Sequence, residues 1–185
     1  LPDWSDVRRL EYTQRCSQFL AGILNGNDEG SISTLPLAYK QAEQSSDFSK
    51  RVLDQLLQLA RYLDTLHNET GKIIRLAIEP EPFCVLETTL ETIQFFERLW
   101  DAADKVALGG VVRQHIGVCY DVCHQAVEFE NPSTAIRELT EADIRINKVQ
   151  ISCAIELDNP TSEKARQALA TVSYTHLRAH ETMAH

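Results

Sequence analysis

Two carboxylates and one imidazole follow short apolar runs of this chain, and their side-chain types suit binding of a divalent cation. Glu79 ends the run IRLAIE, and Asp121 ends the run GVCYD, with His124 three residues later. Carboxylate oxygens favour Mg²⁺ or Mn²⁺, and an added imidazole nitrogen brings Zn²⁺ into range. The same carboxylates could serve as acid and base on a hydroxyl-rich molecule. A third interpretation is that they cap neighbouring loops or pair with Arg75, with His124 a hydrogen-bonded loop residue.

The residues around these positions predict strands that alternate with amphipathic helices. Short apolar runs indicate buried strands, and apolar residues at three- and four-residue steps indicate helices. This alternation is typical of a parallel sheet with crossover helices, in which ligands bind at the carboxyl ends of the strands. The expected strands cover residues 31–35, 73–78, 116–120 and 148–155, and the expected helices cover about 5–24, 47–71 and 88–105, with further helices from 131 and from 159.

Four such strand–helix units are about half of an eight-unit barrel, so the predicted fold class is α/β, a (β/α)8 TIM barrel represented by about four units. An open, doubly wound sheet is the structural alternative. No G-x-G-x-x-G or P-loop motif follows any expected strand, which argues against the nucleotide-binding form of that alternative.

Residue types at the ends of the expected helices support these boundaries. Ser5 is expected to cap the first helix, and Gly71 stands where a left-handed C-cap favours glycine. Thr88-x-x-Glu91 predicts a capping box, and the Asn-Pro pairs at 131–132 and 159–160 predict two more helix starts. The first helix is expected to bury an apolar face made of Val7, Leu10, Cys16, Phe19, Leu20 and Ile23.

Successive side chains of a strand point to opposite faces, which predicts the residues that line the inside of the barrel. Small and polar side chains fall on one face of three strands, and aliphatic side chains fall on the other. The inward set is Arg75, Ala77, Glu79, Gly117, Cys119, Asp121, Gln150 and Ser152, and the outward set is Ile74, Leu76, Ile78, Ile116, Val118, Tyr120, Val149 and Ile151. A barrel mouth lined in this way favours a small polar metabolite as ligand.

Composition excludes several classes of partner. The 185 residues carry a net charge of −9, which argues against binding to nucleic acid, since a phosphate backbone requires a basic face. No apolar run reaches the ~20 residues of a membrane span. The five cysteines are odd in number, so a reducing, cytoplasmic location is expected. A half-barrel has two unpaired sheet edges, which favours a homo-oligomer.

The last residues resemble the product of a cloning or sequencing step. The string VSYTHLRAHET, from Val172 to Thr182, resembles the translation of a transposase sequencing adapter. We therefore divide the chain into residues 1–171, the partial barrel, and residues 172–185, a tail that is not native. His176 and His180 have helical spacing, but they belong to this tail and are excluded as metal ligands. The division also implies that a native C-terminal part is missing.

Several segments resemble known families. GVCYDVCH is similar to the D-x-x-H strand end of xylose-isomerase-like barrels, which include sugar epimerases and the endonuclease IV type of repair nuclease. The segments PDWSDVRRLEY, GSISTLPLAYK, IEPEPFCVLETT and GVCYDVCHQAVEFE together resemble the metabolite-traffic protein EboE family, in order along most of residues 1–157. This resemblance implies a barrel linked to making or exporting a secondary metabolite, with strands four to seven present here.

The resemblance also implies roles for individual residues. Glu79 matches a metal-binding glutamate, Asp121 matches a metal-binding aspartate, and His124 matches a histidine that contacts substrate or metal. Gln150 stands where the superfamily places a histidine ligand. Glutamine would be a weaker metal ligand than histidine, and Gln150 could also contact the substrate. Glu128 could reach a sugar hydroxyl. The expected catalytic residues are Glu79 and His124.

Two functions remain open on the sequence. The first is an isomerase or epimerase that acts on a sugar or a cyclitol-like polyol, by metal-assisted proton transfer between carboxylates. The second is a non-catalytic binding or trafficking protein that keeps the barrel pocket. The retained Glu79, Asp121 and His124 favour the first function, and Gln150 favours the second.

Overall fold

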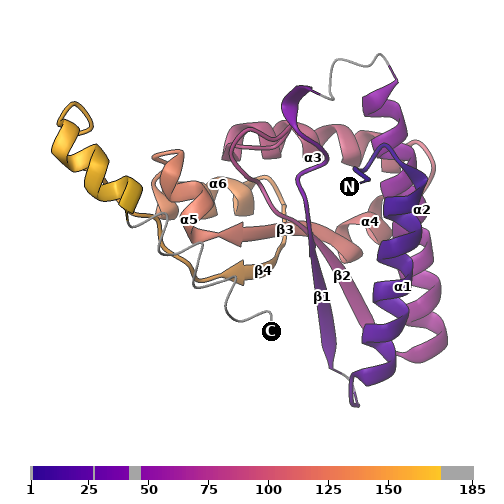
Figure 1. The fold of residues 1–185 in the computed structure, drawn as a ribbon. Coiled ribbons are helices and arrows are strands. Elements are labelled where there is room, and N and C mark those ends of the chain that lie inside the picture. The colour runs from indigo at the N-terminus through magenta and orange to yellow at the C-terminus, as the bar shows by residue number, and fades with distance from the viewer. Residues whose placement is uncertain (1, 27, 42–46, 172–185) are drawn as a thin grey trace. The chain divides into compact units, whose positions relative to one another are not determined.

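A four-stranded parallel sheet forms the centre of the structure, a computed structural model that describes residues 2–26, 28–41 and 47–171. The chain forms two compact units, Leu1–Cys153 and Ala154–His185, and the sheet belongs to the first. Its strands are β1 (Glu29–Thr34), β2 (Ile73–Ile78), β3 (Ile116–Asp121) and β4 (Ile146–Gln150). They are paired in chain order, β1-β2-β3-β4, and every pair is parallel (Figure 1). This arrangement is a curled half-barrel, as the predicted fold class requires.

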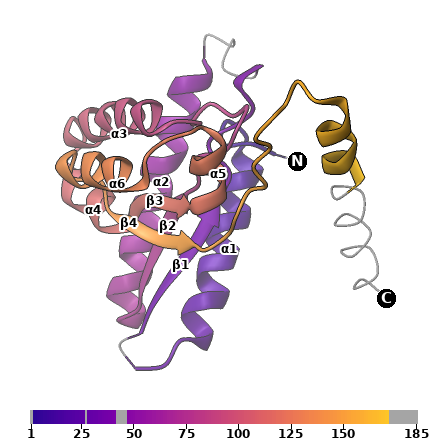
Figure 2. The same cartoon turned by 90° about the vertical axis from the view of Figure 1, so that its left-hand side faces the viewer.

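Helices connect the strands and pack against one another on the sheet. Neighbouring contacts run from α1 to α2, from α2 to α4, from α4 to α3 and from α3 to α6. Figure 2 shows α3, α4 and α6 grouped on one side of the sheet. The helices are α1 (Val7–Ile23), α2 (Phe48–Thr70), α3 (Thr89–Asp104), α4 (Gly109–His115), α5 (Val122–Val127) and α6 (Pro132–Glu141).

The predicted helix ends are confirmed at three positions. Gly71 ends α2 with φ 71°, a left-handed conformation that glycine adopts without steric cost. Thr88 and Glu91 form the complete capping box of α3. Asn131 caps α6, because its side chain accepts a hydrogen bond from Thr134 N at 3.1 Å. Local residue types therefore favour these boundaries, and at the start of α3 a distant residue adds to them, because Glu130 accepts from Thr89 N at 2.9 Å.

The prediction for the first helix is wrong in its cap and in half of its apolar face, whereas Leu10 is buried and Leu20 packs against the core as expected. Asp6, rather than Ser5, caps α1. Val7, Phe19 and Ile23 are more than half exposed, and the buried residues are Leu10, Thr13, Ser17 and Ala21. The Thr13 and Ser17 hydroxyls donate to carbonyl groups of their own helix, so both side chains can be buried without losing a hydrogen bond.

Two strand predictions are also corrected. β1 begins at Glu29, before the expected residue 31. β4 covers Ile146–Gln150, whereas residues 148–155 were expected, and residues 151–157 have no regular structure. The shift follows from the pairing of β3 with β4, which ends where Asp121 meets Gln150 and contains an irregularity at Val118/Cys119. Ser152 therefore lies just beyond β4.

The predicted alternation in β2 and β3 is confirmed by the core. Ile74, Leu76 and Ile78 of β2 are buried in the same apolar cluster as Ile116, Val118 and Tyr120 of β3, together with large residues of α2 and α3. In β4 the outward aliphatic residue Val149 is half exposed, so that strand lacks the helical cover within the first unit. Burial of the β2 and β3 residues fixes their register, because a slip of one residue would turn the aliphatic side chains away from the helices.

The second unit contains a helix at residues 163–171. Ser162 caps it by accepting from Ala165 N at 3.3 Å, whereas Asn159, the predicted cap, accepts from the Thr161 hydroxyl. The tail at 172–185, with His176, His180 and His185, lies outside the described residues. Among the helices that are described, none is both long and apolar enough to cross a membrane.

Candidate functional site

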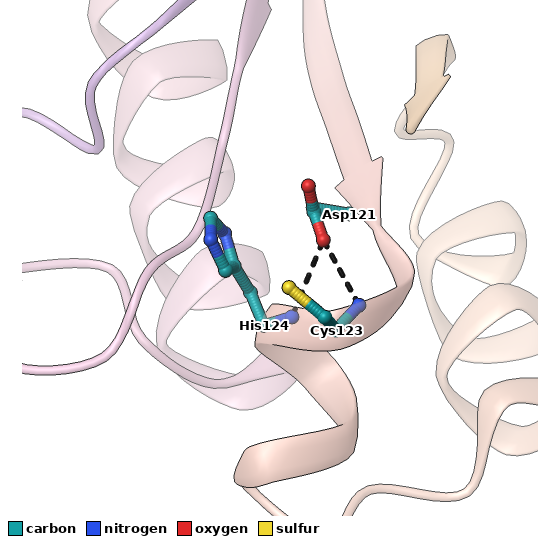
Figure 3. Close-up of side chains that lie close together, drawn as sticks. All are labelled: Asp121, Cys123 and His124. Atoms are coloured by element: carbon teal, nitrogen blue, oxygen red, sulfur yellow. Dashed lines mark hydrogen bonds between the residues drawn. The ribbon is translucent and has the colours of Figure 1, made fainter. Parts of the chain in front are cut away.

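Asp121 lies where β3 ends and α5 begins, and its carboxylate caps that helix. The backbone N–H groups of Cys123 and His124 donate to Asp121 Oδ1 over 2.9 and 3.3 Å (Figure 3). The first turn of a helix leaves such N–H groups without a helical partner, and aspartate at the cap supplies one. The capping interpretation of Asp121 is therefore correct, but it uses only one of the two carboxylate oxygens.

Ser152 reaches the same carboxylate oxygen from the segment after β4. Its hydroxyl donates to Asp121 Oδ1 at 2.6 Å and accepts from Cys123 N at 3.1 Å. Burial opposes ionisation of Asp121, but the hydrogen bonds from Ser152 and Cys123 outweigh it and hold the pKa of Asp121 below its ordinary value. Asp121 is therefore ionised at neutral pH, and Oδ2 lies outside this set of hydrogen bonds.

His124 lies in the first turn of α5, and its ring faces the segment after β2. Nδ1 is 3.2 Å from the carbonyl oxygen of Pro80 and 3.5 Å from Glu79 Oε1. Because a carbonyl oxygen only accepts, Nδ1 carries the proton of the neutral ring and Nε2 keeps the lone pair. Nε2 is therefore the nitrogen that can bind a cation or accept a proton.

Glu79 and Glu81 bring two carboxyl groups to the same imidazole. The Glu79 side chain is only 12% exposed, and burial raises its pKa, with Glu81 and Asp121 adding to the rise and His124 opposing it. Burial likewise raises the pKa of Glu81. A carboxyl group with a raised pKa exchanges its proton closer to neutral pH, which is the property that acid–base catalysis requires.

Two sets of side chains at these strand ends have ligand atoms close enough to share one cation. Glu79, Glu81 and His124 form the first set, and Asp121, Cys123 and His124 form the second; within each set the ligand atoms lie within 4.8 Å of one another. The first set offers two carboxylate oxygens and one nitrogen. In the second set, burial raises the pKa of the Cys123 thiol, so the protonated sulfur is a weak ligand.

Glu81 was missed as a site residue, although the sequence holds a signal for it. The run Glu79-Pro80-Glu81-Pro82 places two carboxylates two residues apart, with prolines that restrict the backbone. Side chains two apart on an extended segment point to the same side. This spacing explains why both carboxyl groups reach His124.

Gln150 joins the strand-end group. It ends β4 in register with Asp121, and its side chain interacts with Glu79, which partly offsets the rise in the pKa of Glu79 caused by burial. The structure thus brings Glu79, Asp121, His124 and Gln150 together at the carboxyl edge of the sheet, as the strand alternation predicts.

Glu128 and Arg75 lie in other surroundings. Glu128 follows α5 and interacts with Glu87 and Lys40, a charged cluster in the loops after β1 and β2. Arg75 forms an ion pair with Glu29, so the expected alternative pairing of Arg75 with Glu79 is wrong. The carboxyl group of Glu79 therefore interacts favourably with His124 and Gln150, while the nearby acids Glu81 and Asp121 repel its negative charge.

No protein-family model matches this chain, and no curated protein matches it. Among solved structures, the chain is similar to the apo form of a 3-keto-D-glucoside 4-epimerase from E. coli, with a TM-score of 0.45 and 14% sequence identity. The match covers 89% of this chain and 70% of that chain. Membership of the EboE family stays a prediction, and the half-barrel architecture rests on the strand order itself.

Proposed function

We propose that this protein binds a divalent cation at the carboxyl ends of β2 and β3 and uses it for isomerase- or epimerase-like proton transfer on a small polyol, such as a sugar or a cyclitol. The convergence of Glu79, Glu81 and His124, with ligand atoms within 4.8 Å, is the observation that carries the proposal. The surrounding fold in this proposal is a xylose-isomerase-like barrel. On the resemblance of several segments to the EboE family, we further propose that the polyol is a secondary metabolite and that the protein acts in the cytoplasm.

The donor set fits a hard or borderline cation. Glu79 and Glu81 supply carboxylate oxygens, and the second oxygen of Asp121 is outside the capping hydrogen bonds. His124 supplies Nε2, because Nδ1 faces the carbonyl oxygen of Pro80. Oxygen ligands with one imidazole suit Mn²⁺, Mg²⁺ or Zn²⁺, and a carbonyl oxygen that accepts from the other ring nitrogen commonly orients a histidine ligand.

Each residue has a role that follows from its surroundings. A bound cation would polarise a hydroxyl or carbonyl oxygen of the polyol. The raised pKa of Glu79, caused mainly by burial, equips its carboxyl group to accept a proton and return it near neutral pH. Asp121, with its lowered pKa, keeps its negative charge throughout.

Calorimetric titration of the protein with Mn²⁺ tests the cation site. We expect saturable binding that Glu79→Gln and Glu81→Gln each weaken by about tenfold or more. Glu97→Gln is the matched control, because Glu97 is an exposed acid on α3. Absence of saturable binding, or equal weakening by the control, would refute the proposal. If Mn²⁺ binds, incorporation of deuterium from D₂O into carbon positions of added sugars and inositols tests proton transfer.

A binding or trafficking protein without catalysis is the second candidate, and Gln150 favours it. A glutamine amide at the end of β4 is a neutral and weaker metal donor than the imidazole that the xylose-isomerase-like resemblance implies at this position. Polyol binding that is unchanged by EDTA and by Asp121→Asn would support this candidate over the enzyme.

A further inference from the structure

A cavity of about 350 Å³ lies beside the candidate site, at the same edge of the sheet. That volume is within the range of pockets that hold small organic molecules. Its walls come from the N-terminal segment, from α1 and from the segments that follow β1 and β2. The lining residues are Pro2, Asp3, Arg9, Leu35, Ala38, Tyr39, Glu81 and Cys84.

Glu81 connects this cavity to the polar site. Glu81 lines the cavity, and its carboxylate also belongs to the set that includes Glu79 and His124. A ligand whose hydroxyl groups meet Glu79 and His124 would therefore have its remaining part directed at the cavity. The two spaces form adjoining parts of one candidate binding region.

The cavity walls are held together by backbone hydrogen bonds between the segments after β1 and β2. Val85 N donates to Ala38 O at 2.9 Å, and Lys40 N donates to Phe83 O at 3.1 Å. Tyr39 and Cys84 form an isolated antiparallel bridge between these bonds. The walls are thus formed before any ligand arrives, so binding would require little ordering of the chain.

The chemistry of the walls favours an uncharged apolar group. Leu35 and Ala38 contribute aliphatic surface, and Tyr39 is 72% exposed. Burial raises the pKa of Cys84 to about 11, so its thiol is neutral. An aromatic side chain exposed at the mouth of an apolar pocket offers a stacking surface for a planar or aliphatic ligand group.

The charged groups of the cavity argue against a phosphate. Of the described residues that line the cavity, Arg9 is the only basic one, and its Nε and Nη2 already donate to the carbonyl oxygen of Pro2 at 3.0 and 2.8 Å. Two acids, Asp3 and Glu81, also line the cavity. A phosphoryl group would therefore meet two carboxyl groups and a guanidinium that is engaged elsewhere.

We propose that this cavity is a subsite for an apolar substituent, aromatic or short alkyl, of the polyol that the neighbouring acids bind. The ligand class is then a glycoside-like conjugate, rather than a free sugar or a sugar phosphate. The polar half of this ligand rests on the proposed function. The assignment of its apolar half depends only on the cavity.

The test compares four probes by NMR titration of the isotope-labelled protein with Mg²⁺ present: phenol, phenyl β-D-glucopyranoside, methyl β-D-glucopyranoside and D-glucose 6-phosphate. We expect phenol and the phenyl glucoside to shift the amide signals of Ala38, Tyr39 and Cys84, and the phenyl glucoside to bind about tenfold more tightly than the methyl glucoside. Tyr39→Ala should reduce that ratio to near one. Phe19→Ala is the control, because Phe19 is an equally exposed aromatic residue on α1 that does not line the cavity.

The outcomes separate the subsite from the cation site. Metal binding without any phenol-induced shift at the cavity overturns the subsite and leaves the proposed function standing. Phenol binding at the cavity without metal binding keeps the subsite and refutes the enzyme. Tighter binding of the sugar phosphate than of the phenyl glucoside, or a phenyl preference that survives Tyr39→Ala, overturns the apolar assignment.

Discussion

Replacing Asp121 with alanine should destabilise the metal-free protein, because this side chain is a cap as well as a candidate ligand. One oxygen accepts from Cys123 N, His124 N and the Ser152 hydroxyl, and the residue is only 6% exposed. Loss of a helix cap costs about 1 kcal/mol, and loss of the hydrogen bond that the partly buried Ser152 hydroxyl donates to this charged group adds about 1.5–3 kcal/mol. We therefore expect Asp121→Ala to lower the free energy of unfolding by about 2–4 kcal/mol. Asp121→Asn retains an acceptor oxygen and should cost about half as much.

Urea unfolding followed by circular dichroism, with EDTA present, measures both changes. Asp101→Ala is the control, since Asp101 is an exposed acid on α3 whose pairing with Lys105 contributes at most about 0.5 kcal/mol. The pH dependence has a defined sign. The folded-state pKa of Asp121 is lowered from 3.8, so its ionic contribution is present above that value and is lost as pH falls through the lower folded-state pKa. The stability difference between the native protein and Asp121→Asn should therefore shrink in that acidic range.

Two results would refute this reasoning about Asp121. A cost below about 1 kcal/mol for Asp121→Ala would mean that the three hydrogen bonds do not form in solution. Equal costs for the alanine and asparagine variants would mean that the acceptor oxygen is not what stabilises the helix start.

Three further predictions concern the site and the sheet. Burial raises the folded-state pKa of Glu79 above 4.5, so its contribution to stability is full below that value and is lost as pH rises through the raised pKa. At neutral pH without metal, Glu79→Gln should therefore unfold at a higher urea concentration than the native protein. A lower urea midpoint for Glu79→Gln would contradict this. Gln150→His should tighten Zn²⁺ binding by about tenfold or more in calorimetry, and unchanged affinity would place residue 150 outside the cation site. Within the described part of the chain, β1 and β4 each pair with another strand on one side only. We therefore expect concentration-dependent self-association in sedimentation velocity. A single monomeric species at all concentrations would contradict this expectation.

Local patterns predicted most of the sheet and several helix ends. The alternation of Ile74, Leu76 and Ile78 with Arg75 and Ala77 indicated which face of β2 is covered by helices, and the core confirms it. Gly71 and the Thr88 capping box lie where their chemistry requires. These features depend on residues within a few positions of one another, so their physics is visible in a linear sequence.

Other predictions failed where burial depends on a neighbouring element. The apolar residues Phe19 and Ile23 of α1 suggested a core-facing stripe, yet they are exposed because α2 and the sheet contact the side that carries Leu10 and Ala21. The role of Glu128 as a polyol contact stays a prediction; the structure shows only that its charge interacts with Glu87 and Lys40.

The sequence by itself determined the β–α order, the outward aliphatic faces of β2 and β3 and the presence of Glu79, Asp121 and Gln150 at strand ends. The spacing of Glu79 and Glu81 places them on one side of their segment, but only the tertiary structure decided that His124 meets them and that Ser152 holds the Asp121 carboxylate. The physical reason is that these contacts join the ends of different strands. Their distances depend on strand register and on the first turn of α5, which no local pattern of residues specifies.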